Sequence, residues 1–299
     1  GPVASMSAFP DIGEPDLEMP SQGSAVWHAL LFMPAPRRIG LAAAAACHHE
    51  IAATVRAPRE DIVTTVRLGW WREETGLLAQ GRPRHPATRH LVEGGPNPAP
   101  DFALLARPLS ALIDAADREW RGTTYEDRPA LVRHCEEDGG SLYELIRQAT
   151  HTAPAGAETV AALRRLGAAD RLVGIVRAYH QDLVDGRRYV PASLLATQAA
   201  DDPSMTPELR EALGGIAECA RDAFREGIER LPPAEREPCA PVLVLAALRA
   251  RLLRRLASRR FDIIGHWTEL TAISKLTTAW NTARRSLRGK APRLAGITP

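Results

Sequence analysis

Residues 156–185, GAETVAALRRLGAADRLVGIVRAYHQDLVD, decide the fold class of this chain. Alanine, leucine and arginine, which favour helices, dominate the stretch. Its apolar residues recur near helical spacing, at Val160, Leu163, Leu166, Leu172, Ile175 and Val176. The pattern predicts one long helix that begins near Gly156 and ends near Asp185.

The same pattern continues over nearly the whole chain from Ser24 onward. Proline and glycine separate further predicted helices, at about residues 36–56, 59–80, 103–121, 127–149, 205–230, 240–260 and 268–288. Alternating β-branched runs are scarce, and no glycine-rich phosphate loop follows a strand, which argues against a nucleotide-binding α/β fold. The connections are short, so we expect one all-α, bundle-like domain over residues 24–299.

Composition narrows the class of protein. With 299 residues, 45% of them hydrophobic, the chain can bury a large core. Its 38 basic and 36 acidic residues nearly balance, so nothing requires nucleic acid as a partner. No segment reaches the roughly 18 uncharged apolar residues that a membrane span needs. The cysteines form no CxxC pair, which favours reduced thiols in a cytoplasmic protein, at Cys47, Cys135, Cys219 and Cys239.

Residues 1–23 differ from the rest of the chain. They carry Pro10, Pro15 and Pro20 with little periodicity, which predicts a disordered tail. Gly1-Pro2 is typical of the scar that a protease leaves when it removes a purification tag. We expect no signal peptide.

Two blocks of sequence resemble a known family. The first begins with FMPAPRR at 32–38, continues through HHE at 48–50, and ends with RLGWWRE at 67–73. The second joins Val176-Arg177 to GRRYVP at 186–191. From about Trp27 to Trp280 the chain resembles the squalene/phytoene synthases, and WWRE and GRRYVP are the most specific parts of the match. Weaker matches lie at His85-Pro86, Tyr125 and His134-Cys135.

The resemblance implies an isoprenoid-synthase-like helical bundle with a central cavity. Members of that family bind isoprenoid diphosphates through Mg²⁺ held by two Asp-rich helices. Ionisation of the diphosphate gives an allylic cation, which an acceptor traps. Mg²⁺ suits this task because it prefers carboxylate and phosphate oxygens and stabilises the charge that develops on the leaving group.

This sequence departs from the family at both acidic motifs. Aligned without gaps, the acids of the first motif fall on Ala52, Ala53 and Arg56. The second motif falls on Ala178, Gln181 and Asp182, so only Asp182 is retained, with Asp185 about one turn later. These losses argue against an intact Mg²⁺ cluster.

The resemblance nevertheless implies roles for residues in the matched blocks. The catalytic acids would be Asp182 and Asp185. The diphosphate would be bound by Arg38, Arg177, Arg187, Tyr189 and His49, since guanidinium groups suit phosphate oxygens. The cavity would be lined by Ala53, Trp71 and Ala178. A remodelled metal site, for Mg²⁺, would draw on Asp182, Asp185, His49 and His180.

Each of these residues also has a simpler interpretation. His48, His49 and His180 would then be ordinary polar helix residues, and Arg37 and Arg38 would be surface arginines. Trp70 and Trp71 would belong to the core. The arginine-rich run 249–260 would be a solvated helix face; the sharper interpretation is a peripheral membrane contact, which suits a lipid substrate.

Two functions remain open at this level. The first is a prenyltransferase with an isoprenoid diphosphate donor and a second isoprenoid or an aromatic small molecule as acceptor. It is favoured by the retained Arg177, Asp182 and GRRYVP. The alternative is a non-catalytic assembly or binding factor, because the same departures resemble a branch of the family that includes complex I assembly factors. The lost acids favour this alternative. The oligomeric state is left open.

Overall fold

The computed structural model describes residues 17–57, 60–93, 101–122, 124–195 and 204–298. In these ranges the chain forms α-helices and two short 3-10 helices and no strand, which confirms the predicted all-α fold. Most of the predicted disordered tail, residues 1–16, lies outside the described residues. None of the described helices combines the length and the apolar character that crossing a membrane requires.

The helices follow the chain in a simple order. The first five are α1 (Ala25–Phe32), α2 (Ala35–Arg56), α3 (Asp61–Ala79), α4 (Pro86–Glu93) and α5 (Phe102–Trp120). The next five are α6 (Arg128–Thr150), α7 (Ala157–Val184), α8 (Pro207–Arg230), α9 (Ala240–Ser258) and α10 (Ala272–Ser286). The 3-10 helices are Ala192–Leu194 and Pro233–Glu235.

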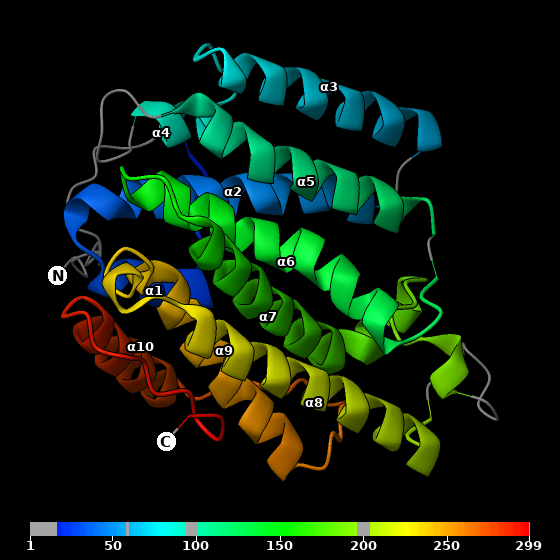
Figure 1. Ribbon diagram of the computed structural model, residues 1–299. Coiled ribbons are helices and arrows are strands. Elements are labelled where there is room, and N and C mark those ends of the chain that lie inside the picture. Colours follow the sequence, from blue (N-terminus) through cyan, green and yellow to red (C-terminus); the bar gives the residue numbers. More distant parts are fainter. Residues whose placement is uncertain (1–16, 58–59, 94–100, 123, 196–203, 299) are drawn as a thin grey trace, which may run out of the picture.

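The long helices lie side by side across the molecule (Figure 1). Helix α3 forms one edge and packs on α5; α6 and α7 lie in the middle; α8 and α9 follow, and α10 forms the opposite edge. Helix α2 packs against both α5 and α6. The two helices that carry the matched motifs, α2 and α7, therefore lie on either side of α6.

Glycines allow α6 to approach both of its neighbours closely. A Cβ atom added to Gly139 of α6 would lie 2.1 Å from the carbonyl oxygen of Gly167 in α7. A Cβ atom on Gly40 of α2 would lie 2.1 Å from the carbonyl oxygen of Ala149 in α6. Real Cβ atoms are not found so close to backbone atoms, so only glycine permits these crossings. The contacts fix the positions of α2 and α7 relative to each other.

The long helix α7 matches its predicted bounds. It begins after Gly156 and ends at Asp185, where Gly186 adopts a φ of 77°. Glycine takes this left-handed conformation without the strain a side chain would bring, so the chain reverses sharply here. The amide of Arg187 then donates to the carbonyl oxygen of Asp182 at 2.7 Å. This turn returns the GRRYVP block onto the last turn of α7.

Candidate functional site

Asp182 and Asp185 share one guanidinium group at the end of α7. Arg187 donates from Nε to Asp182 Oδ1 at 3.0 Å and from Nη2 to Asp185 Oδ2 at 2.7 Å. Asp182 is buried, whereas Asp185 is exposed. Burial raises the pKa of Asp182, and the nearby Arg171 and Arg187 oppose that shift only in part. The structure thus brings together three of the predicted site residues and pairs both acids with an arginine.

Arg56 approaches the same region from the last turn of α2. Its Nε lies 3.2 Å from Oε1 of Glu119, a nearly buried carboxylate on α5. Oε2 of Glu119 also accepts from Nη2 of Arg171, on α7, at 3.5 Å. Burial raises the pKa of Glu119, but Arg171 and Arg56 lower it, and the net shift is downward. A guanidinium group therefore occupies the position where the resemblance places the last acid of the first motif.

A second carboxylate extends this arrangement into α6. Asp138 Oδ2 accepts from Arg171 Nε at 2.8 Å, and Asp138 Oδ1 lies 3.2 Å from His48 Nε2. Burial opposes ionisation of Asp138, yet His48 and Arg171 hold its pKa well below the usual range. The result is a chain of guanidinium and carboxylate groups that ends at an imidazole and spans four helices, hereafter the ion-pair chain: Arg56, Glu119, Arg171, Asp138 and His48.

Aromatic rings cover one side of the ion-pair chain. The guanidinium of Arg171 stands 4.7 Å from the ring centre of Tyr189. Tyr189 in turn stacks with Tyr125 and His134, each at 6.4 Å between ring centres. Burial lowers the pKa of His134 to about 4, so this ring is neutral at pH 7. The predicted diphosphate ligand Tyr189 is thus buried in an aromatic cluster against Arg171.

Three neighbouring cavities meet at Arg56. A polar cavity of about 380 Å³, hereafter the mouth, is lined by charged and aromatic residues, including Arg56, Glu119, Trp120, Tyr125, Asp185, Arg187, Arg188 and Tyr189. A second cavity of about 380 Å³, hereafter the chamber, has a mainly apolar lining that includes Met19, Val26, Ala45, Ala46, Ala52, Leu142 and Ile146. Between them lies a space of about 10 Å³ beside His48, Ala52, Arg56, Glu119 and Asp138.

Helix α2, which carries His49, lines all three cavities, whereas α7 reaches them only at its cap residue Asp185, and Asp182 itself lines none of them. His49 is exposed and lines the chamber together with His48 and Arg56. Asp182 accepts a hydrogen bond from Arg187, and Arg187 lines the mouth. Of the two alanines in the first motif, Ala52 lines the chamber and the small space, and its neighbour Ala53 lines none of the three cavities.

Two predicted diphosphate ligands lie elsewhere. Arg177 precedes Asp182 by five residues, about 140° around a helix. It pairs with Glu269 at 3.3 Å and stacks on Trp267 at 4.6 Å, beside a separate cavity of about 590 Å³. Arg38 precedes Arg56 by 18 residues, or about 27 Å along α2, and its Nε donates to the Met33 carbonyl at 2.9 Å.

Three further predicted site residues, Trp71, Ala178 and His180, line none of the three cavities. Trp71 is buried against Trp70 and His85, with ring centres at 5.2 and 5.1 Å, so it belongs to the core near α4. Ala178 and His180 are partly buried on α7 and line none of the three cavities. The Nδ1 atom of His180 is buried without a hydrogen-bond partner among the described residues.

The carboxylates in the site do not fit a Mg²⁺ cluster. Nowhere in the described part of the chain do three histidine, cysteine, aspartate or glutamate side chains gather as a metal ion would require. Each acid of the site already contacts a guanidinium or imidazole group. The predicted metal ligands Asp182, Asp185, His49 and His180 do not form such a group, and Mg²⁺ binding stays a prediction.

Sequence reasoning did not assign a role to Glu119, Asp138 or Arg171. For Arg171 a signal existed, because it precedes Asp182 by 11 residues, which returns to the same helix face after three turns. Glu119 and Asp138 are isolated acids on other helices, and no motif marks them. Their role depends on which helices pack together, and one sequence does not reveal that.

Comparison with known proteins gives a consistent picture. A squalene/phytoene synthase family model matches residues 20–277. A crystal structure of a dehydrosqualene synthase in complex with ligand is similar with a TM-score of 0.73 and 15% identity, over 89% of this chain and 93% of that one. Squalene synthase HpnC from Alicyclobacillus acidocaldarius gives 0.64 and 19%, over 79% and 88%.

YisP from Bacillus subtilis subsp. subtilis strain 168 gives a TM-score of 0.57 and 15% identity, over 85% of this chain and 89% of that one. At these identities the solved structures establish the fold alone. No curated protein sequence matches this chain.

Proposed function

Because the chain belongs to the squalene/phytoene synthase family, we propose that it is a prenyltransferase that uses an isoprenoid diphosphate as donor. The observation that carries the proposal is the position of Arg56, which lines both the charged mouth and the apolar chamber. A donor with an anionic head and an apolar tail matches such a pair of cavities. The head would lie in the mouth and the tail in the chamber.

Arginines in the mouth supply the charge that a diphosphate needs. Arg188 lines the mouth and forms no ion pair with any described residue. Arg187 and Arg56 each have donor groups beyond those used by their carboxylate partners, because a guanidinium carries five N–H donors. Charge-assisted contacts of this kind are short, strong and suited to phosphate oxygens.

The reaction would be a heterolytic substitution. The bond between the allylic carbon and the diphosphate oxygen breaks, and its electron pair leaves with the diphosphate. Arg56, Arg187 and Arg188 would stabilise that negative charge. The acceptor then forms the new carbon bond and releases a proton. No step here depends on Mg²⁺, because the acids of the site do not fit the metal cluster.

The identity of the acceptor, an aromatic small molecule or a second isoprenoid, also belongs to the proposal. Trp120 and Tyr125 present aromatic side chains to the mouth, and ring stacking would suit an aromatic small molecule there. A second isoprenoid would instead need to share the chamber. The four cysteines are free thiols, which supports a cytoplasmic location as part of this proposal.

A non-catalytic binding or assembly role is the second candidate. The observation that favours it is the ion-pair chain, in which carboxylates and cations already neutralise one another. In such a network the carboxylates already have partners within the protein, so none of them requires a ligand. Under this alternative the site is a relic whose charges serve only to hold α2, α5, α6 and α7 together.

Release of pyrophosphate distinguishes the two candidates. The protein would be incubated with dimethylallyl, geranyl or farnesyl diphosphate, with and without a phenolic acceptor, and the products identified by mass spectrometry. The proposal expects turnover with at least one donor, and its loss in Arg187→Gln. The matched control is Arg210→Gln, a partly buried arginine on α8 whose Nη1 donates to the Arg260 carbonyl. Absence of any turnover in the wild type would support the non-catalytic role.

A further inference from the structure

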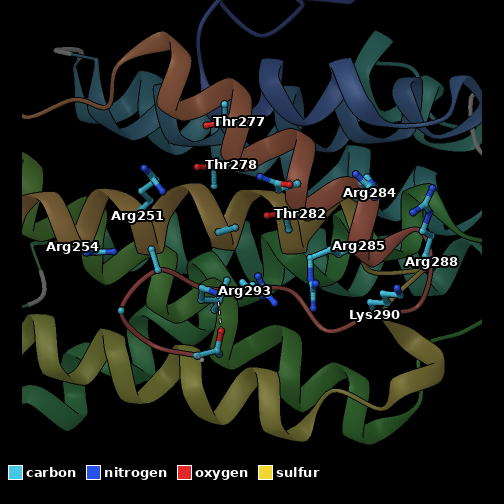
Figure 2. Close-up of a pocket in the computed structure, with 16 residues that line it drawn as sticks. Arg251, Arg254, Thr277, Thr278, Thr282, Arg284, Arg285, Arg288, Lys290 and Arg293 are labelled. Carbon is cyan, nitrogen blue, oxygen red and sulfur yellow. Dashed lines mark hydrogen bonds between the residues drawn. The ribbon is translucent and has the colours of Figure 1, made fainter.

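A strongly basic pocket lies far from the ion-pair chain, at the edge of the molecule formed by α9, α10 and residues 289–298 (Figure 2). Its volume is about 560 Å³. No acidic residue lines the pocket, and none of its cations forms an ion pair within the described part of the chain. Those cations are Arg251, Arg254, Arg284, Arg285, Arg288, Lys290 and Arg293.

Two of these arginines each use only one N–H group, the one on Nε, in a hydrogen bond within the protein. Arg285 Nε donates to the Ala291 carbonyl at 2.9 Å, and Arg251 Nε donates to Ser274 Oγ at 2.6 Å. Their Nη groups are left for another acceptor. Thr278 also lines the pocket, and its buried Oγ1 has no hydrogen-bond partner among the described residues. Clustered cations and hydroxyl groups of this kind indicate a site for phosphate oxygens.

An exposed apolar stripe borders the pocket on α10. Ile273, Leu276 and Trp280 leave 75%, 45% and 46% of their surface exposed. Their spacing of three and seven residues puts them on one face of the helix. Arg284 stacks on Trp280, with its guanidinium 5.4 Å from the ring centre, and it also lines the pocket. The stripe and the cationic pocket are therefore adjacent.

We propose that the outer face of α10 docks on an anionic lipid bilayer. Lipid phosphates would enter the basic pocket, while Ile273, Leu276 and Trp280 would insert at the headgroup level, where tryptophan is favoured. The cations provide charge complementarity to the membrane surface. We choose a bilayer over a soluble polyanion because a soluble ion would leave the apolar stripe uncovered.

The arginine-rich run 249–260 contributes only part of this surface. Arg251 and Arg254 line the pocket, but Arg249 forms an ion pair with Asp170 at 2.7 Å on the inner side of α9. The remaining cations come from residues 284–293, which the sequence did not connect with the run. The folding of 289–298 back toward α9 brings the two groups together.

Cosedimentation with lipid vesicles tests the proposal. Wild type is expected to bind vesicles of phosphatidylcholine and phosphatidylglycerol in a 3:1 ratio, and to bind pure phosphatidylcholine weakly. Each basic residue near an anionic surface contributes about 1 kcal/mol, so Arg284→Glu with Arg288→Glu should weaken partitioning by at least about 30-fold. Trp280→Ser, which keeps every charge, should weaken it by about fivefold.

The matched control reverses two arginines at the opposite edge. Arg67→Glu with Arg82→Glu makes the same change in charge near α3, at exposed positions, and should retain more than half of the binding. Circular dichroism and thermal unfolding establish that each variant is folded. The proposal is overturned by equal binding to both vesicle types, by equal losses in the two double variants, or by binding of inorganic polyphosphate or RNA without vesicle binding.

Discussion

At the scale of single residues, Arg56 occupies the position where the resemblance places the last acid of the first motif. An acid there would attract a metal ion; a guanidinium carries its own positive charge. Glu119 holds that charge beside the mouth, and Arg171 also pairs with Glu119 and with Asp138. Positive charge therefore reaches this region through side chains.

Replacing Arg56 tests its role directly. Arg56→Gln should weaken binding of farnesyl diphosphate by about tenfold or more, because a lost charge-assisted contact costs roughly 1.5–3 kcal/mol. Isothermal titration provides the measurement. The control is Arg72→Gln on α3, whose guanidinium pairs with Asp114 and Asp117 at a comparable exposure. Equal affinity for the two variants would show that Arg56 does not contact the ligand.

His134 should make the fold sensitive to mild acid. Burial lowers its folded pKa to about 4 from an ordinary value of 6.5. The unfolded chain therefore binds the proton more readily, and stability falls as the pH drops from 6.5 toward 4, by at most about 1.4 kcal/mol per pH unit. His134→Phe keeps a ring beside Tyr125 and Tyr189 but cannot titrate.

Chemical unfolding of wild type and His134→Phe at several pH values between 7 and 4 measures this contribution. The variant should lose less stability than wild type over that interval. Parallel curves would mean that the imidazole titrates normally. Asp138 contributes in a separate window, because its depressed pKa stabilises the fold above about pH 3.8.

At the scale of elements, the crossing of α6 and α7 depends on glycine. A Cβ atom on Gly167 would lie 2.0 Å from the carbonyl oxygen of Gly139, whereas one on Gly174 of the same helix meets no atom within 4 Å. Gly167→Ala should lower the free energy of unfolding by about 1–3 kcal/mol or more through overpacking. Gly174→Ala should raise it by up to about 1 kcal/mol, since alanine favours helices.

Denaturant unfolding of both glycine variants measures the two effects. The comparison is well matched, because the substitution and the helix are the same and only the surroundings differ. Similar changes for Gly167→Ala and Gly174→Ala would contradict the close crossing of α6 and α7. The position of the second motif relative to α6 would then lose its main support.

The sequence predicts where helices begin and end better than it predicts which helices and side chains lie together in space. Breakers and helix formers gave α2, α7 and α9 close to their observed bounds. Helix α4 begins at Pro86, a residue that the sequence pattern treats as a helix breaker, because proline is also favoured in the first turn of a helix. The matched motifs place Arg177 and Asp182 in one site, but five residues along α7 put their side chains about 140° apart around the helix. Arg38 lies about 27 Å from Arg56 along α2, a separation that matching motifs does not reveal.

At the scale of the whole molecule, two separate regions are rich in arginine. In the mouth, Arg56 and Arg187 pair with acids, and the mouth adjoins an apolar chamber. The basic pocket near α10 has no acid among its lining residues. The two regions lie on different sides of α7, near α2 and α5 in one case and near α9 and α10 in the other (Figure 1). In the proposed account one binds the donor's head and the other a membrane surface.

The most direct test is calorimetric titration with farnesyl diphosphate in EDTA and again in Mg²⁺. Using Arg284→Glu with Arg288→Glu alongside wild type excludes binding in the basic pocket. The account predicts saturable binding in EDTA, retained by the double variant, with an affinity that Mg²⁺ changes less than Arg56→Gln does. Absence of saturable binding in both buffers, or binding only when Mg²⁺ is present, would contradict it.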